Sequence, residues 1–243
     1  MLKKINAVDV TLPGRRTDIG SIHPITQSIQ EIGEYFSKLN FFLMEGPEIE
    51  NDSNNFDFLN IPKDHPDRNK RSTFWLNQKY LLRTQVSCMQ IRSMRCRRPP
   101  IRMISSGKVY RKDYDCNHTP MFHQTDGFII EKTVSFIYLR DILIEFLKNF
   151  FKRDIHIKLR SSYFPFTEPS IEIDVLDTMG NWIEVIGCGM MHPKILNNIN
   201  VNSKEYSGLA FGIGVDRITM VRHEIPDLRI FFENDLRFLK QFR

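Results

Sequence analysis

Residues 210–217 read Ala-Phe-Gly-Ile-Gly-Val-Asp-Arg, a glycine-rich strand that runs into a helix near the end of this 243-residue chain. Gly212 and Gly214 carry no side chain, so a ligand or a neighbouring strand can approach the backbone closely there. Arg217 follows at the start of the helix, where a guanidinium can meet phosphate oxygens in pairs. The stretch therefore predicts a sheet that carries an arginine where a strand ends. The plainer alternative is a surface arginine without a ligand.

The strands before it alternate apolar and polar residues. In 155–160 and in 171–175, every second residue is Ile, Leu or Val, and the others are charged or polar. This period of two is typical of an antiparallel sheet with one polar face. Further strands are expected at 101–104, 108–111, 127–131 and 182–186, a hairpin at 74–82, and helices at 24–39, 87–95 and 136–150. Strands and helices do not alternate regularly, so we expect an α+β fold, an antiparallel sheet flanked by helices.

Composition excludes several classes of protein. Hydrophobic residues make up 41% of the chain, which is enough for a core and excludes a fully disordered protein. No apolar run is long enough to span a bilayer, and the amino-terminal stretch does not read as a signal peptide. The four cysteines contain no CxxC pair, so the reducing cytoplasm is the expected compartment. We expect one domain over 21–243, preceded by an extended lead-in segment over 1–20.

The net charge of +5 is modest, but its distribution is uneven. Five arginines and no acid fall within 91–102. Such a cluster can meet the phosphates of a polyanion, or it can be a solvated basic face without a partner.

Candidate nucleotide-binding residues are side chains, because the chain contains no P-loop motif. Arg111 ends a predicted strand just before a loop that carries Asp113 and His118. Gln124 and Asp126 then alternate at the start of the next strand, so both can point into one pocket.

The segment Phe164-Pro165-Phe166-Thr167-Glu168-Pro169 places two aromatic rings around a proline. It can form a stiff apolar platform for an aromatic ligand, or it can be an ordinary turn in the core. The nearby carboxylates Glu168, Glu172, Asp174 and Glu184 could hold magnesium beside substrate phosphates, or they could simply solvate one face of the sheet.

Taken together, three ordered motifs resemble those of class II aminoacyl-tRNA synthetases. They are residues 41–47, then Tyr110-Arg111 with residues 122–124, and finally residues 212–217. Seven segments are similar to the alpha-subunit family of bacterial phenylalanine–tRNA synthetases: HPITQSI, FDFLNIP, LLRTQVS, HTPMFHQ, SSYFPFTEPS, GCGMMHP and FFENDLRFLKQF. The similarity extends over nearly the whole chain from about residue 8.

This resemblance implies a class II catalytic domain that activates phenylalanine with ATP and transfers it to tRNA(Phe). It implies that Arg111 holds the α-phosphate, that Arg217 holds the γ-phosphate, and that His118 completes the catalytic set. Asp113 and Phe122 would also line the ATP site, and Glu168 would bind Mg²⁺.

For the amino acid, the resemblance implies that Phe164 and Phe166 contact the ring and that Ala210 forms the pocket floor. The ammonium and carboxylate would be surrounded by Trp75, Gln85, Ser87, Gln90, Gln124 and Asp126. The family also implies a beta subunit in an α₂β₂ assembly and no membrane partner, so the chain alone should be poorly active.

Three departures from the family pattern carry expectations. Asp126 stands where glutamate is usual, so its contact with the amino acid would be lengthened, lost or bridged by water. Asp216 also replaces the commoner glutamate. The long amino-terminal helical arm would be missing, and we expect weaker binding of tRNA as a result.

Three alternative functions stay open at this point. The chain could be an inactive paralogue that serves as a binding or regulatory module, although Arg111, Arg217 and residues 164–166 are intact. It could be a class II ligase for another amino acid. It could also be a basic RNA-binding domain without chemistry, although exposed aromatic RNA-binding signatures are missing.

Overall fold

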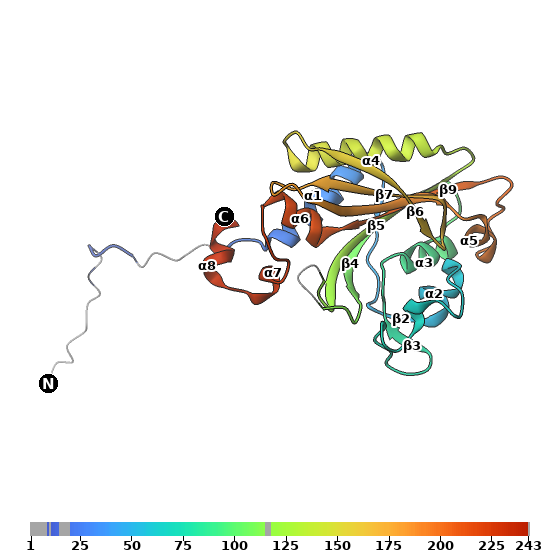
Figure 1. Ribbon diagram of the computed structural model, residues 1–243, viewed down its shortest axis with the longest axis horizontal. Coiled ribbons are helices and arrows are strands. Elements are labelled where there is room, and N and C mark those ends of the chain that lie inside the picture. Colours follow the sequence, from blue (N-terminus) through green and yellow to red (C-terminus); the bar gives the residue numbers. More distant parts are fainter. Residues whose placement is uncertain (1–8, 10, 15–19, 115–117, 243) are drawn as a thin grey trace.

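The computed structural model describes residues 9, 11–14, 20–114 and 118–242, so most of the predicted lead-in segment lies outside the described residues. Figure 1 shows a strongly twisted sheet with helices on both faces. The helices are α1 Pro24–Lys38, α2 Asp52–Asn55, α3 Cys88–Cys96, α4 Phe136–Phe151, α5 Pro193–Asn198, α6 Val215–Arg222, α7 Ile230–Glu233 and α8 Leu236–Leu239, with 3-10 turns η1 Asp57–Leu59, η2 Pro66–Arg68 and η3 Lys240–Phe242. The strands are β1 Phe42–Leu43, β2 Ile49–Asn51, β3 Tyr80–Leu82, β4 Ile101–Tyr110, β5 Met121–Glu131, β6 Ile157–Phe164, β7 Thr167–Leu176, β8 Trp182–Met191 and β9 Ser207–Gly214.

The main sheet has seven strands in the order β1-β4-β5-β9-β8-β7-β6, and β2 and β3 form a separate pair. Every neighbouring pair in the main sheet is antiparallel except β1 and β4, which run parallel. The predicted α+β class is confirmed, with this one correction to the antiparallel sheet. The parallel pair was not predictable from alternation, because β1 is only two residues long.

Two predicted strands, 101–104 and 108–111, are in fact the single strand β4. Its partner β5 likewise begins at Met121, six residues before the predicted strand at 127–131. In the register of the pair, Gly107 lies opposite Gln124 and Ser105 lies opposite Asp126. Polar and glycine residues interrupt the hydrophobic pattern there, while the backbone hydrogen bonds continue. The interruption marks the position of the site.

Helices α1, α4 and α6 cover one face of the sheet (Figure 1). Ser135 caps α4 by accepting a hydrogen bond from the Tyr138 backbone N–H at 3.2 Å, which satisfies one otherwise unpaired donor. Phe36 of α1 lies fully buried, with its ring centroid 5.3 Å from Phe146 of α4 and 4.9 Å from Phe211 of β9. Because truncating such a ring leaves a cavity, Phe36→Ala would cost about 3–5 kcal/mol.

The opposite face carries a second core, formed with α3, the strand β3, the turn η1 and the short helix α5. Phe128 of β5 and Ala210 of β9 belong to this second core. Here the helices leave part of the sheet uncovered, and a cavity opens over β5, β7, β8 and β9.

The arginine-rich stretch 91–102 is largely engaged within the protein. Arg92 pairs with the buried Glu50 at 2.6 Å, and Arg102 pairs with Glu131 at 2.7 Å. Arg95 donates to the Asn54 side chain at 2.9 Å. Three of the five arginines therefore hold elements together, which weakens the interpretation of the stretch as a free basic patch.

No helix in the described part of the chain is both long enough and apolar enough to cross a bilayer.

Candidate active site

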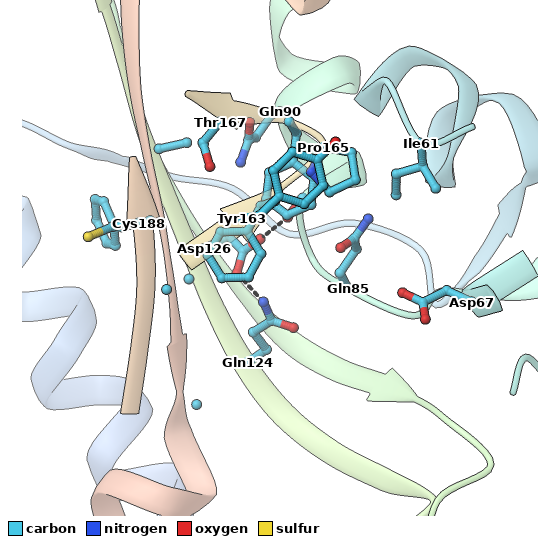
Figure 2. A pocket seen from close by; sticks show the side chains of 18 of the residues that line it. Ile61, Asp67, Gln85, Gln90, Gln124, Asp126, Tyr163, Pro165, Thr167 and Cys188 are labelled. Carbon is cyan, nitrogen blue, oxygen red and sulfur yellow. Dashed lines mark hydrogen bonds between the residues drawn. The ribbon is translucent and has the colours of Figure 1, made fainter. Parts of the chain in front are cut away.

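The candidate site is a cavity of about 320 Å³ on the second face of the sheet. Figure 2 shows Cys188 of β8 on one side of it and Ile61 and Asp67 on the other. Of the residues predicted for phenylalanine, eight line this cavity: Gln85, Ser87, Gln90, Gln124, Asp126, Phe164, Phe166 and Ala210. Residues from distant parts of the sequence thus meet at one place, as the resemblance implies.

Asp126 is the buried anion of this cavity. Ser87 donates a hydrogen bond to one of its carboxylate oxygens, and the Gln124 side-chain amide donates to the other at 2.7 Å (Figure 2). Burial raises the pKa of Asp126 to about 6, and the hydrogen bonds from Ser87 and Gln124 oppose that rise. Because the group is still largely ionised at neutral pH, it can attract a cation.

The Gln124 side chain provides a second hydrogen-bond acceptor beside the Asp126 carboxylate. Its Oε1 is buried and makes no hydrogen bond, although the amide nitrogen of the same group is paired. A buried unpaired acceptor is costly unless a ligand satisfies it. Together, Asp126 and Gln124 present the acceptors that an ammonium group requires.

Gly212 of β9 leaves room for this pair. A Cβ at position 212 would lie 2.9 Å from both the Asp126 Oδ1 and the Gln124 Nε2. This close approach explains why the strand predicted at the end of the chain carries glycine there.

An aromatic slot occupies the β6–β7 side of the cavity. The rings of Phe164 and Phe166 lie nearly parallel, at an angle of 11°, with centroids 5.6 Å apart. Gly187 of β8 leaves room for them, because a Cβ there would lie 2.9 Å from the Phe164 ring. Ala210 contributes only a methyl group to the lining. The slot suits a flat apolar group.

A second, smaller cavity of about 110 Å³ adjoins the first. Arg111 and Phe122 line both cavities, and Arg217, Asp113 and His118 line the smaller one. Arg217 lies 3.4 Å from the His118 ring nitrogen. The two arginines predicted to act together therefore share one space.

Arg111 is the bridge between the cavities. Its Nε donates to the Thr84 carbonyl at 3.1 Å, and its guanidinium lies 5.2 Å from the centre of the Phe122 ring. The side chain is exposed to the open cavity and surrounded by protein on its other sides. This burial lowers the pKa of Arg111, and the nearby positive charge of Arg217 lowers it further. Two cations held this close are suited to a polyanion.

Arg217 is oriented from two directions. It donates to the Glu184 carbonyl at 3.2 Å, and the Glu184 carboxylate lies 3.7 Å away. The preceding residue, Asp216, accepts hydrogen bonds from the backbone and ring of His123 on β5. This contact fixes the start of α6 against the sheet, so Arg217 projects into the cavity.

These observations agree with comparisons to known proteins. The chain matches the family described as tRNA synthetases class II core domain (F) over residues 7–242. It is 56% identical to the phenylalanine–tRNA ligase alpha subunit of Proteus mirabilis and 55% identical to that of Edwardsiella ictaluri, over 97% of this chain and 72% of each relative. The chain belongs to the family of phenylalanine–tRNA ligase alpha subunits.

A solved structure supports the class II fold independently. Pyrrolysyl-tRNA synthetase from Desulfitobacterium hafniense superposes with a TM-score of 0.66 at 18% identity, covering 84% of this chain and 71% of that one. At this level of identity the likeness concerns the fold alone.

Two residues assigned from the family resemblance lie outside both cavities. Trp75 lines a different cavity, and its indole donates to the Arg68 carbonyl at 3.2 Å. Glu168 is exposed, and its carboxylate lies 3.6 Å from His192. Neither is among the described residues that line the site, so their roles stay predictions.

The structure adds lining residues that the sequence patterns did not indicate. His65 and Asp67 lie in a stretch without periodicity, at η2, and Tyr163 sits at an exposed position of β6. Tyr163 is one of the regularly spaced exposed residues of β6, so the sequence pattern does not distinguish it from the others. The negative charge of Asp67 raises the pKa of Arg111 and so opposes the effect of burial.

A magnesium ion that arrives with ATP needs few protein ligands. In the described part of the chain, no group of three or more His, Cys, Asp or Glu side chains could hold a metal ion. Phosphates and water normally supply most ligands of such an ion, with one or two carboxylates. Glu184 lines the cavity beside Arg217 and fits this requirement. Burial raises the pKa of Glu184, so a cation there would favour its ionised form.

Proposed function

We propose that this chain is the catalytic alpha subunit of a phenylalanine–tRNA ligase. It would join phenylalanine to ATP as phenylalanyl adenylate, with release of pyrophosphate, and then transfer the phenylalanyl group to the terminal adenosine of tRNA(Phe). The observation that carries this proposal is Arg111, which lines both the cavity with the aromatic slot and the cavity with Arg217. The relatives named as phenylalanine–tRNA ligases support the choice of substrate.

The amino acid would bind by its two ends. The ring would lie in the slot of Phe164 and Phe166, with the Ala210 methyl beneath it. The ammonium would meet Asp126 and the unpaired Gln124 Oε1. This arrangement directs the carboxylate of the substrate toward Arg111.

ATP would lie across the two arginines. Arg111 would contact the α-phosphate together with the attacking carboxylate, and Arg217 would contact the γ-phosphate. The carboxylate oxygen attacks the α-phosphorus, and the bond to pyrophosphate breaks on the opposite side. Since the attacking group is already ionised, no general base is required, and the protein contributes position and charge neutralisation.

His118 and Asp113 would bound the ATP site on the loop side. Mg²⁺ bound to the phosphates would supply further positive charge. Glu184 fits as a ligand, and Glu168 is the position that the family resemblance indicates.

The partners proposed are a beta subunit in an α₂β₂ assembly, tRNA(Phe) and L-phenylalanine. The name of the relatives, an alpha subunit, supports a second kind of chain. The cytoplasm is the proposed compartment. The described cysteines, Cys88, Cys96 and Cys188, are free thiols, which fits a reducing environment.

ATP–pyrophosphate exchange tests the proposal directly. The chain coexpressed with the beta subunit of its own organism should exchange label only when phenylalanine is present. Tyrosine should support much slower exchange, although an apolar pocket rejects one added hydroxyl poorly. Exchange that depends on another amino acid, or none with any, would contradict the proposal.

A further inference from the structure

Arg83, directly after β3, is a buried cation that the proposed reaction leaves without a role. The residue is only 2% exposed. Its Nε donates a hydrogen bond to the Lys108 carbonyl at 2.8 Å, and its Nη1 donates to the Gly46 and Pro47 carbonyls, each at 3.3 Å. In the described part of the chain its guanidinium forms no salt bridge. Because a buried charge without a counter-ion is costly, its place in the fold requires an explanation.

The backbone of Arg83 is held as firmly as its side chain. Its N–H donates to the Glu48 carbonyl at 2.9 Å, and its carbonyl accepts a hydrogen bond from the Tyr110 N–H at 2.9 Å. The residue is therefore tied to β4 on one side and to the segment before β2 on the other. Its guanidinium has one fixed position.

Gly107 of β4 provides the space that the guanidinium fills. A Cβ at position 107 would overlap the Arg83 Nη2. In the register of the sheet, Gly107 lies opposite Gln124 of β5. Residues directly opposite each other in an antiparallel pair point to the same face, and so does the residue two positions along the strand, here Asp126. The guanidinium thus lies on the face of the sheet that carries Gln124 and Asp126.

The positive charge of Arg83 acts on the Asp126 carboxylate. Burial raises the pKa of Asp126 to about 6, and the hydrogen bonds from Ser87 and Gln124 oppose this rise, as do the charges of Arg83 and Arg111. Arg111 lines the cavity in which the phosphates would lie. Arg83 is not among the described residues that line either cavity. Its charge therefore acts from behind the lining, where no substrate phosphate would compete for it.

We propose that Arg83 is a positioning residue for the amino-acid substrate: its guanidinium, seated over Gly107, holds Gln124 and Asp126 in the arrangement that receives the substrate ammonium. This inference rests on the proposed function, in which those two residues bind that ammonium. Arg83 itself would touch no substrate. A neutral side chain in its place would leave the Asp126 carboxylate easier to protonate, and a protonated carboxyl does not attract an ammonium.

The test compares Arg83→Met, which removes the charge at similar length, with Arg83→Lys, which keeps the charge. The matched control is Leu143→Ala. Leu143 of α4 is fully buried in the core on the other face of the sheet, so its truncation lowers stability far from the site (Figure 1). Each variant is coexpressed with the beta subunit. Phenylalanine-dependent ATP–pyrophosphate exchange is measured from about pH 5 to about pH 9 at varied phenylalanine and ATP. Calorimetry measures binding of phenylalanine in parallel, without ATP.

Arg83→Met should change the binding of one substrate and its pH dependence. At neutral pH its KM for phenylalanine should rise about tenfold and its KM for ATP less than about twofold, while the acidic limb of kcat/KM for phenylalanine should move upward by about one pH unit. Arg83→Lys should return the limb close to its place in the unmodified protein. Leu143→Ala should leave both KM values and the limb unchanged, because a loss of stability alone moves none of them.

Gly107→Ala tests the same geometry without removing the cation. The added Cβ would displace the guanidinium from its seat, so the KM for phenylalanine should rise about threefold and the acidic limb should move in the same direction. This variant decides the question if Arg83→Met does not assemble with the beta subunit.

Three results would overturn the proposal. The first is an acidic limb at the same pH in Arg83→Met and in the unmodified protein. The second is an equal rise in the KM for phenylalanine and for ATP, which would assign Arg83 to the fold as a whole. The third is unchanged KM and limb in Gly107→Ala. If the unmodified protein shows no phenylalanine-dependent exchange, the proposed function is wrong, and the calorimetric affinities of the same variants for phenylalanine then decide this inference.

Discussion

The two halves of the catalytic site are built differently. The amino-acid half lies on strands: Asp126 comes from β5, Ala210 from β9, and Phe164 and Phe166 from the β6–β7 connection. Ser87 and Gln124 already donate hydrogen bonds to Asp126, and the Gln124 Oε1 is left for a ligand. The phosphate half uses long cationic side chains, Arg111 and Arg217, at the ends of elements and beside an exposed loop. A prearranged half built on strands suits the selection of one amino-acid side chain. Long cationic side chains suit phosphates, whose charge changes during the reaction.

The largest expected effect concerns the phosphate half. Arg111→Ala should lower kcat/KM for ATP–pyrophosphate exchange by about 10³-fold, because the residue would stabilise charge at the reacting phosphorus. Arg111→Lys should recover only part of this loss, since an ammonium cannot form paired contacts. Steady-state exchange kinetics measure both variants. If kcat/KM for exchange falls less than threefold in Arg111→Ala, the phosphate half does not depend on this cation and the proposed difference between the halves is wrong.

The amino-acid half should show its effect in binding. Asp126→Asn keeps the shape of the side chain and removes its charge, so the KM for phenylalanine should rise by about 30-fold, with the KM for ATP little changed. Exchange at varied phenylalanine concentration measures this. Equal effects on both substrates would mean that Asp126 supports the whole site and not the ammonium alone.

The same carboxylate predicts a pH dependence. Burial raises the pKa of Asp126 to about 6, and only its ionised form attracts an ammonium. In the unmodified protein, kcat/KM for phenylalanine should therefore fall by about tenfold per pH unit below about pH 6. Asp126→Asn should lack this fall. A fall at the same pH in both proteins would assign the titration to another group.

Removal of the Asp126 charge should weaken substrate binding but increase the stability of the folded protein. A carboxyl whose pKa is raised in the folded state binds more protons there than in the unfolded chain, so stability decreases as pH rises from about 4 to about 6. At pH 7 the free energy of unfolding of Asp126→Asn should therefore exceed that of the unmodified protein by roughly 1–3 kcal/mol. Near pH 4 the two proteins should be equally stable. Denaturant titration at the two pH values measures the difference. A variant that is less stable at pH 7 would show that the charge is compensated in the empty site.

The smallest expected effect concerns the slot. Ala210→Gly removes the methyl group that lines it and should admit para-substituted phenylalanines, which lowers discrimination against them by about tenfold. Adenylation of para-chlorophenylalanine against phenylalanine measures this. Unchanged discrimination would place the para position of the ring away from Ala210.

Periodicity in the sequence predicted some strands and site residues and missed others. Alternation revealed β6 and β7, and the spacing of Gln124 and Asp126 correctly placed both in one pocket. The same period failed on β4, where Ser105 and Gly107, which lie opposite Asp126 and Gln124, interrupt the apolar pattern. His65 and Asp67 could not be predicted, because the stretch around η2 has no periodicity and its position depends on tertiary contacts such as the bond from Arg68 to the Ile61 carbonyl.

The assignments of individual roles depended on family resemblance more than on pattern. Arg111 and Arg217 are separated by the five strands β5 to β9 and the two helices α4 and α5, and nothing in this spacing indicates that they meet. The sheet order explains the meeting: β4 and β9 both pair with β5.

A crystal structure with a non-hydrolysable phenylalanyl-adenylate analogue tests the bridging position of Arg111 most directly. The ring should lie against Phe164 and Phe166, the amine should contact Asp126, and the α-phosphate mimic should contact Arg111. An analogue bound with its phosphate mimic away from Arg111, or with its ring outside the slot, would contradict a single continuous site.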